Sequence, residues 1–247
     1  PDPAPVPPPT PHQYVAGFSS HCGDGRALPI GAVRFAGDED DKIENLLGIP
    51  DFNNDGRDDI AVGAPRSGFG LGRVYVAFRR SPGTVGVGGL EGDFPLSKIA
   101  LGPDETNRLD GILLCKDTID GLGSSLAGEF DFNADGVFDL VIGSPDAGSG
   151  TGEVIIVFGG NNIVSPAGGI TVSTLLTQTR TETGAPVAMR IRGATVGGEK
   201  GRFGFNVANA GDVDGDGLDD LLISAPEASP RFDADPNNAV DELSALG

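Results

Sequence analysis

The sequence predicts an all-β protein assembled from repeated blades of a β-propeller. An acidic loop begins at Asp51, at Asp131 and at Asp212, so one design returns about every 80 residues, and a regular internal repeat is typical of propellers, solenoids and arrays. The chain also has 40 Gly and 19 Pro residues. Its apolar runs are only about four to eight residues long, which favours short strands and tight turns over helices.

Four short strands are expected in each repeat, in the same order. The first is predicted at residues 32–37, 112–117 and 188–193, ahead of a glycine-bearing link and a second apolar segment. A third strand follows each acidic loop directly, as DIAVGAP, DLVIGSP or DLLISAP, and a fourth is predicted at residues 72–79 and 152–160. Four strands joined mostly by hairpins match a propeller blade, whose faces are buried against neighbouring blades.

Two longer stretches interrupt this pattern. Residues 81–110 and 161–186 are expected to be excursions between the third and fourth strands of one blade. Their sequences differ while the acidic loops stay alike, so they are the expected place for partner-specific contacts. Plain connecting segments are the alternative.

The two ends of the chain differ in character. The Pro-rich residues 1–13 are expected to form an extended tether. Residues 14–247 are expected to form a partial propeller, with units around residues 32–80, 112–160 and 188–247. Closed propellers have about four to eight blades, so three units predict part of a larger ring. A symmetric assembly of partial rings, made with copies of the chain or with other chains, is the alternative.

The charge and the cysteines limit the classes of partner and site. A formal net charge of −19 argues against a nucleic acid or an anionic membrane as partner, because the phosphate groups of either would be repelled. No run approaches the length that spans a membrane, so direct membrane insertion is not expected. Cys22 and Cys115 lack the spacing of zinc, redox or haem motifs. The sequence leaves two alternatives for them, a single disulfide or two buried thiols.

The acidic loops share one pattern of oxygen-bearing residues. Numbered from the first Asp, side-chain oxygens fall at positions 1, 3, 5 and 9, and Gly stands at position 6. Position 7 varies, as expected of a residue that offers only its backbone carbonyl. The predicted metal ligands are Asp51, Asn53, Asp55, Arg57 and Asp59 in the first loop, Asp131, Asn133, Asp135, Val137 and Asp139 in the second, and Asp212, Asp214, Asp216, Leu218 and Asp220 in the third. Among these, Arg57, Val137 and Leu218 would bind through the carbonyl oxygen.

Calcium is the predicted ion, with one site in each loop. It takes six to eight oxygens at roughly 2.3–2.6 Å, whereas Mg²⁺ demands tighter octahedral geometry. A loop supplies these oxygens from alternate residues if it bends sharply, and Gly permits the bend. EF-hand loops begin in the same way but place an acid at position 12 and continue into a helix. Position 12 is Val62, Ile142 or Ile223 here, so a strand is expected instead, with position 9 closing each site.

Residues 201–228, GRFGFNVANAGDVDGDGLDDLLISAPEA, resemble the FG-GAP repeat of integrin alpha subunits and of many bacterial surface and secreted proteins. The matching elements are FG at residues 203–204, LG at residues 122–123, and GAP, GSP and SAP at residues 63–65, 143–145 and 224–226. The first unit lacks the FG element. The resemblance implies a seven-bladed β-propeller with calcium in the hairpin loops of one face, serving adhesion or extracellular binding.

The predicted function is a calcium-stabilised, non-catalytic binding or adhesion module that is secreted or lies at the cell surface, with a protein or glycan partner. Millimolar extracellular calcium would keep even loose sites occupied. A structural subunit of a surface layer, sheath or filament is one alternative, and an accessory propeller of a larger secreted hydrolase is another. No enzyme is expected within the chain. Its only histidines are His12 and His21. His21 stands next to Cys22, but residues adjacent along a strand do not converge into a catalytic triad.

Overall fold

The computed structural model describes residues 13–16, 33–37, 41–78, 92–100, 110–160, 163, 166, 168–196 and 199–228. The first described strand is β1 (Gln13–Ala16), close to the start of ordered structure expected from the sequence. The rest of the predicted tether, both histidines and Cys22 lie outside the described residues.

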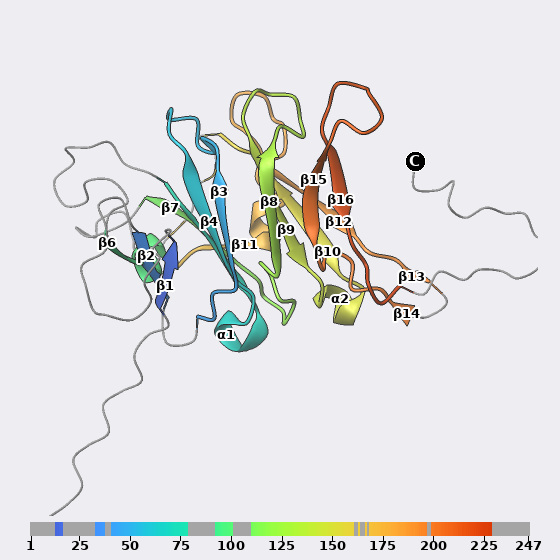
Figure 1. Cartoon of the computed structure of the whole chain (residues 1–247), viewed down its shortest axis with the longest axis horizontal. Helices are drawn as coiled ribbons and strands as arrows, with labels where there is room; N and C mark the ends of the chain where they lie inside the picture. The colour runs from blue at the N-terminus through green and yellow to red at the C-terminus, as the bar shows by residue number, and fades with distance from the viewer. Residues whose placement is uncertain are drawn as a thin grey trace, which may run out of the picture.

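Antiparallel blades stand side by side in the middle of the molecule (Figure 1). The first blade contains β3 (Asn45–Ile49), β4 (Asp59–Ala64), β5 (Arg73–Ala77) and β7 (Gly111–Cys115). The second contains β8 (Ser125–Phe130), β9 (Asp139–Ser144), β10 (Glu153–Val157) and β12 (Ala188–Arg192). The third repeat contributes β15 (Val207–Gly211) and β16 (Asp220–Ile223) within the described part of the chain. This blade arrangement confirms the predicted all-β fold.

Strand pairing places the blade boundaries one strand later than the sequence-based units. The strand expected to open the second unit is β7, which pairs with β5 and ends the first blade. Likewise β12 pairs with β10, and β2 (Val33–Ala36) pairs with β1 and not with β3. A repeating pattern has no intrinsic first strand, so only the hydrogen-bonded pairing defines the blade. The new boundaries put both excursions between the third and fourth strands of one blade, as expected.

Each excursion adds a parallel strand to the outer edge of the preceding sheet. From the first excursion, β6 (Gly92–Pro95) pairs with β2, and from the second, β11 (Ile170–Thr171) pairs with β7. A short helical turn follows in both cases, η1 (Leu96–Ala100) or α3 (Val172–Leu175). Both turns bury two apolar side chains. The excursions therefore cover strand edges that would otherwise be open to pairing.

Tight turns occupy the edge of the blades opposite the acidic loops (Figure 1). Single turns α1 (Ser67–Gly70) and α2 (Ala147–Gly150) join the second and third strands of their blades. The short hairpin of β13 (Thr195–Val196) and β14 (Glu199–Lys200) follows the second blade. Every helix in the described ranges is too short to cross a membrane.

The central strands β4, β5, β9 and β10 are buried on both faces, so apolar cores lie between the blades. In β10, Ile155 and Val157 pack with the first blade, whereas Val154 and Ile156 pack toward the third repeat. The same alternation in β5 sends Tyr75 toward the β1–β2 sheet. A strand buried on both faces needs apolar residues at every position. This explains the continuous apolar runs of the sequence.

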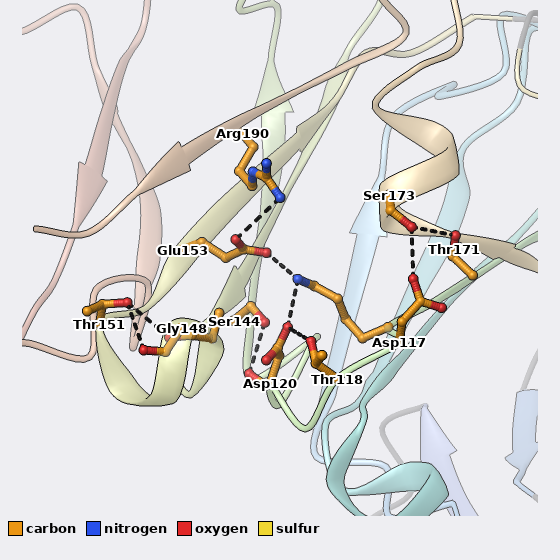
Figure 2. Close-up of polar contacts among 12 residues, drawn as sticks. Asp117, Thr118, Asp120, Ser144, Gly148, Thr151, Glu153, Thr171, Ser173 and Arg190 are labelled. Atoms are coloured by element: carbon orange, nitrogen blue, oxygen red, sulfur yellow. Dashed lines mark hydrogen bonds and ion pairs between the residues drawn. The ribbon is translucent and has the colours of Figure 1, made fainter.

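A buried ionic cluster joins the first and second blades (Figure 2). Lys116, directly after β7, forms an ion pair with Glu153 at the start of β10, and its Nζ lies 2.8 Å from Asp120. The three side chains are only 7–9% exposed. The hydroxyl of Thr118 donates to Asp120 at 2.6 Å, and Arg190 on β12 lies 3.8 Å from the second oxygen of Glu153. The cluster fixes the chain where it passes from one blade to the next.

Cys115 is a half-buried free thiol at the end of β7. Burial raises the pKa of this thiol. Cys22, the other half of the disulfide left open by the sequence, lies outside the described residues.

Candidate metal centres

The three acidic loops connect the first two strands of each repeat and gather along one edge of the molecule, at the top of Figure 1. Strands follow them directly, namely β4, β9 and β16. Position 12 of each loop, Val62, Ile142 or Ile223, lies within its strand. The expected strand after each loop is confirmed, and the helix of an EF-hand is absent from all three of these described segments.

The first Asp of each loop organises the backbone in the same way. In the first loop, the carboxylate of Asp51 accepts hydrogen bonds from the N–H groups of Asp55 at 2.6 Å and Gly56 at 2.9 Å. The equivalent bonds run from Asp135 and Gly136 to Asp131 at 3.0 and 2.7 Å, and from Asp216 and Gly217 to Asp212 at 3.0 Å each. A carboxylate has about four lone-pair sites, so these bonds leave capacity on each first Asp that a cation can use.

Glycine at position 6 makes the bend as predicted. Gly56, Gly136 and Gly217 have φ values of 85°, 83° and 92°. No heavy atom lies within 4 Å of the point where a Cβ would stand at any of them. The requirement is therefore for the left-handed backbone conformation, which glycine adopts without steric cost, and not for space.

Positions 3 and 5 turn their oxygens into the same loop. The N–H of position 5 donates to the side chain of position 3 at 3.0–3.1 Å in all three loops. In the third loop, carboxylate oxygens of Asp212, Asp214 and Asp216 lie within 4.8 Å of one another. Two oxygens on opposite sides of one calcium ion are about 5 Å apart, so this donor set fits the ion. Asn53 and Asn133 supply an amide oxygen at position 3 of the other loops.

Position 9 lies beneath the loop, at the start of the following strand. Asp59 and Asp139 are 1% and 0% exposed. The carboxylate of Asp139 accepts from the N–H groups of Phe132 at 2.8 Å and Gly159 at 2.9 Å. Burial raises the pKa of Asp139 to about 6; the two N–H donors oppose this shift, and the nearby carboxylates of the same loop add to it. Asp220 accepts from the N–H of Val213 at 2.8 Å in the third loop.

At position 7, the backbone N–H group and the side chain make different contacts. The N–H groups of Val137 and Leu218 donate to the position-5 carboxylates at 2.9 and 2.8 Å. The guanidinium of Arg57 lies 3.7 Å from the carboxylate of Asp55, within the same loop. Ligation through the position-7 carbonyl oxygens stays a prediction.

Two residues that no sequence motif predicts lie beside the second loop. Gly159 follows β10 and reaches the loop through its N–H group, and Arg180 lies 2.7 Å from Asp135 through its guanidinium. Neither residue is close to the loop in the sequence. No local motif signals them, because only the fold brings the end of β10 and the excursion alongside the hairpin.

Comparison with known proteins agrees with this geometry. The FG-GAP repeat family matches residues 46–77, 122–157 and 203–241. Integrin alpha pat-2 of Caenorhabditis elegans is 27% identical over 198 residues, which are 72% of this chain and 13% of that protein. Phosphatidylinositol-glycan-specific phospholipase D of Rattus norvegicus is 31% identical over 191 residues, 74% of this chain and 18% of that protein. Integrin alpha-IIb of Mus musculus is 27% identical over 184 residues, 74% and 15% respectively.

Stacked four-stranded blades with an acidic hairpin loop at one edge define a β-propeller-type repeat protein. The matched segments identify the repeats more closely. This chain is an FG-GAP repeat protein similar to integrin alpha subunits. It spans less than a fifth of the length of the relatives named above.

Proposed function

We propose that this chain is a calcium-stabilised, non-catalytic binding or adhesion module that works outside the cell. One observation carries the calcium part: in all three loops the side chain at position 1 accepts from the N–H groups of positions 5 and 6. That arrangement draws several acidic oxygens to the inside of a small loop. Such oxygens repel one another unless a cation neutralises them.

The proposed ligands are the fifteen loop residues predicted from the sequence. In each loop these are the side chains at positions 1, 3, 5 and 9 and the carbonyl oxygen at position 7. Calcium would supply positive charge and fix the hairpin between the first two strands of a blade. Selective binding to the folded form adds about 2.7 kcal/mol per site when free calcium exceeds the Kd a hundredfold.

The adhesion part rests on the relatives and on where calcium is abundant. Two integrin alpha pat-2 proteins and integrin alpha-IIb match more than two thirds of this chain. Loose oxygen sites stay occupied at the millimolar calcium found outside cells. The partner proposed here is a protein or a glycan on another surface.

A calcium titration tests this function. Isothermal titration of the calcium-free chain is expected to show saturable binding, and Asp212→Ala should remove one site from the total. The chain should also adhere to immobilised extracellular protein or glycan in calcium, and much less in a chelator. Saturable calcium binding without adhesion would support the calcium sites and contradict the adhesion function. An absence of calcium binding would overturn the proposal.

A second candidate function is the accessory propeller of a larger hydrolase. The similarity to the phospholipase D of Rattus norvegicus, at 31% identity, favours it. This function requires a catalytic domain on the same polypeptide, because the candidate sites described here hold structural oxygens. Mass spectrometry of the native polypeptide, together with a hydrolase assay on it, separates the two candidates.

A further inference from the structure

Arg180 is held in a fixed position beside the second acidic loop. It begins a tight turn in the excursion between β10 and β12. Its N–H donates to the carbonyl of Ala185 at 2.7 Å, and its carbonyl accepts from the N–H of Gly184 at 2.8 Å. A bridge between Thr179 and Pro186 closes the base of the turn. These contacts fix the backbone of Arg180, and with it the position from which the side chain extends.

The guanidinium of Arg180 makes two short contacts at the second loop. Nη1 lies 2.7 Å from Oδ2 of Asp135, the carboxylate at position 5. Nη2 donates to the carbonyl of Gly159 at 2.7 Å. The side chains of Arg180 and Asp135 are 15% and 24% exposed, so the pair is largely shielded from water. Charge-assisted hydrogen bonds in such surroundings are among the stronger ones.

Gly159 connects this pair to both neighbouring loops. Its N–H donates to Asp139 at position 9 of the second loop. The next residue, Gly160, donates its N–H to the carbonyl of Phe52 in the first loop at 2.7 Å. A Cβ at Gly159 would stand 2.2 Å from the carbonyl oxygen of Phe138. This close packing means that Arg180 supports the second loop and its junction with the first.

The third loop offers the comparison, because its position-5 carboxylate has no such cation among the described residues. No Lys or Arg in the described ranges forms an ion pair with Asp212, Asp214 or Asp216. Asp216 occupies the position that Asp135 occupies in the second loop. The two loops therefore share their hydrogen-bonding pattern and differ in the basic side chain that reaches position 5.

We infer that Arg180 is an internal counter-cation of the second loop, which holds Asp135 in place without calcium and makes this loop less calcium-dependent than the third. The inference rests on the proposed calcium sites. A fixed positive charge beside a cation site opposes binding of the ion and also relieves repulsion among the carboxylates when the ion leaves. Arg180 is a positioning residue that acts on the site through Asp135.

Hydrogen–deuterium exchange during a calcium titration tests the inference loop by loop. Peptides covering residues 131–139 and 212–220 report a separate calcium midpoint for the second and third loops. In the unaltered chain, the second loop should become protected at higher calcium than the third. In Arg180→Gln, the midpoint of the second loop should fall about tenfold, and the loop should exchange faster in chelator.

Controls separate this inference from the proposed function. Arg202→Gln removes a comparable pair, Arg202 with Asp146 at 2.8 Å, away from the loops, and should leave both midpoints unchanged. Protection of the second loop before the third in the unaltered chain would overturn the role of Arg180, even if the variant fails to fold. An unchanged midpoint in Arg180→Gln, with the third loop responding to calcium, would overturn it as well. Failure of every loop to respond would overturn the calcium sites themselves.

Discussion

The carbonyl oxygen of Gly204 lies directly against Gly143 of the preceding blade. A Cβ on Gly143 would stand 2.1 Å from that oxygen and 2.2 Å from the hydroxyl of Ser125. Gly204 belongs to the FG element of the third repeat and Gly143 to the GSP element of the second. The carbonyl oxygen of Gly123 approaches Gly63 in the same way, at 2.4 Å from the point where a Cβ of Gly63 would stand. The two halves of the FG-GAP motif are thus the two sides of one contact between blades.

Replacing Gly143 by Ala should therefore destabilise the protein by about 1–3 kcal/mol, because backbone atoms must move to admit the methyl group. Urea unfolding monitored by circular dichroism measures this. Gly48→Ala in β3 is the matched control, since nothing lies within 4 Å of its Cβ position. The control should be neutral or slightly stabilising. Equal effects of the two substitutions would contradict the blade-contact explanation.

Lys116→Met should cost about 3–5 kcal/mol of unfolding free energy, because it leaves Asp120 buried without its cation and Glu153 with only Arg190 at 3.8 Å. Arg66→Met is the control: its pair with Glu44 at 2.8 Å joins side chains that are 68% and 40% exposed. Exposed pairs contribute about 0–1 kcal/mol. Thermal unfolding at matched pH compares the two. A loss for Lys116→Met as small as that of the control would show that the buried cluster contributes little.

Removal of calcium should loosen the whole row of blades, since each loop fixes the first two strands of its repeat. With free calcium at a hundredfold above the Kd, each site adds about 2.7 kcal/mol to the folded state. Adding a chelator should lower Tm and speed cleavage by a protease within the three loops. Differential scanning fluorimetry and limited proteolysis measure these effects. A Tm and a cleavage pattern that ignore the chelator would contradict calcium stabilisation.

Stability without calcium should depend on pH through Asp139. Its pKa is raised to about 6 in the folded protein, above its value of roughly 3.9 in an unfolded chain. The folded state therefore binds this proton more tightly between about pH 4 and 6, so acidification through this window stabilises the calcium-free protein. Asp139→Asn should remove that part of the pH dependence, as urea unfolding at several pH values would measure.

The same proton should compete with calcium. Protonated Asp139 offers a poorer ligand, so the calcium affinity of the second loop should fall as the pH drops below about 6. Exchange protection of residues 131–139 at pH 5 and pH 7.5 checks this. Affinity that stays constant across this range would mean that Asp139 does not bind the ion.

The sequence by itself determined the strands of the blades, the acidic loops and the bend at position 6. These features are local: alternating oxygens followed by a glycine and an apolar run specify a turn between two strands wherever the chain carries them. The position of Gly56, Gly136 and Gly217 in the left-handed region could be expected from residue type alone. The period of the repeat then predicted blades.

Only the tertiary structure decided which strands share a blade, how the excursions are used and which cation meets the second loop. The repeat has the same period wherever counting begins, so hydrogen bonding between β5 and β7 was needed to define the blade. Arg180 meets Asp135, far earlier in the sequence, because an excursion of the chain returns beside a hairpin. Contacts of this kind depend on long-range packing, and no local pattern of residues encodes them.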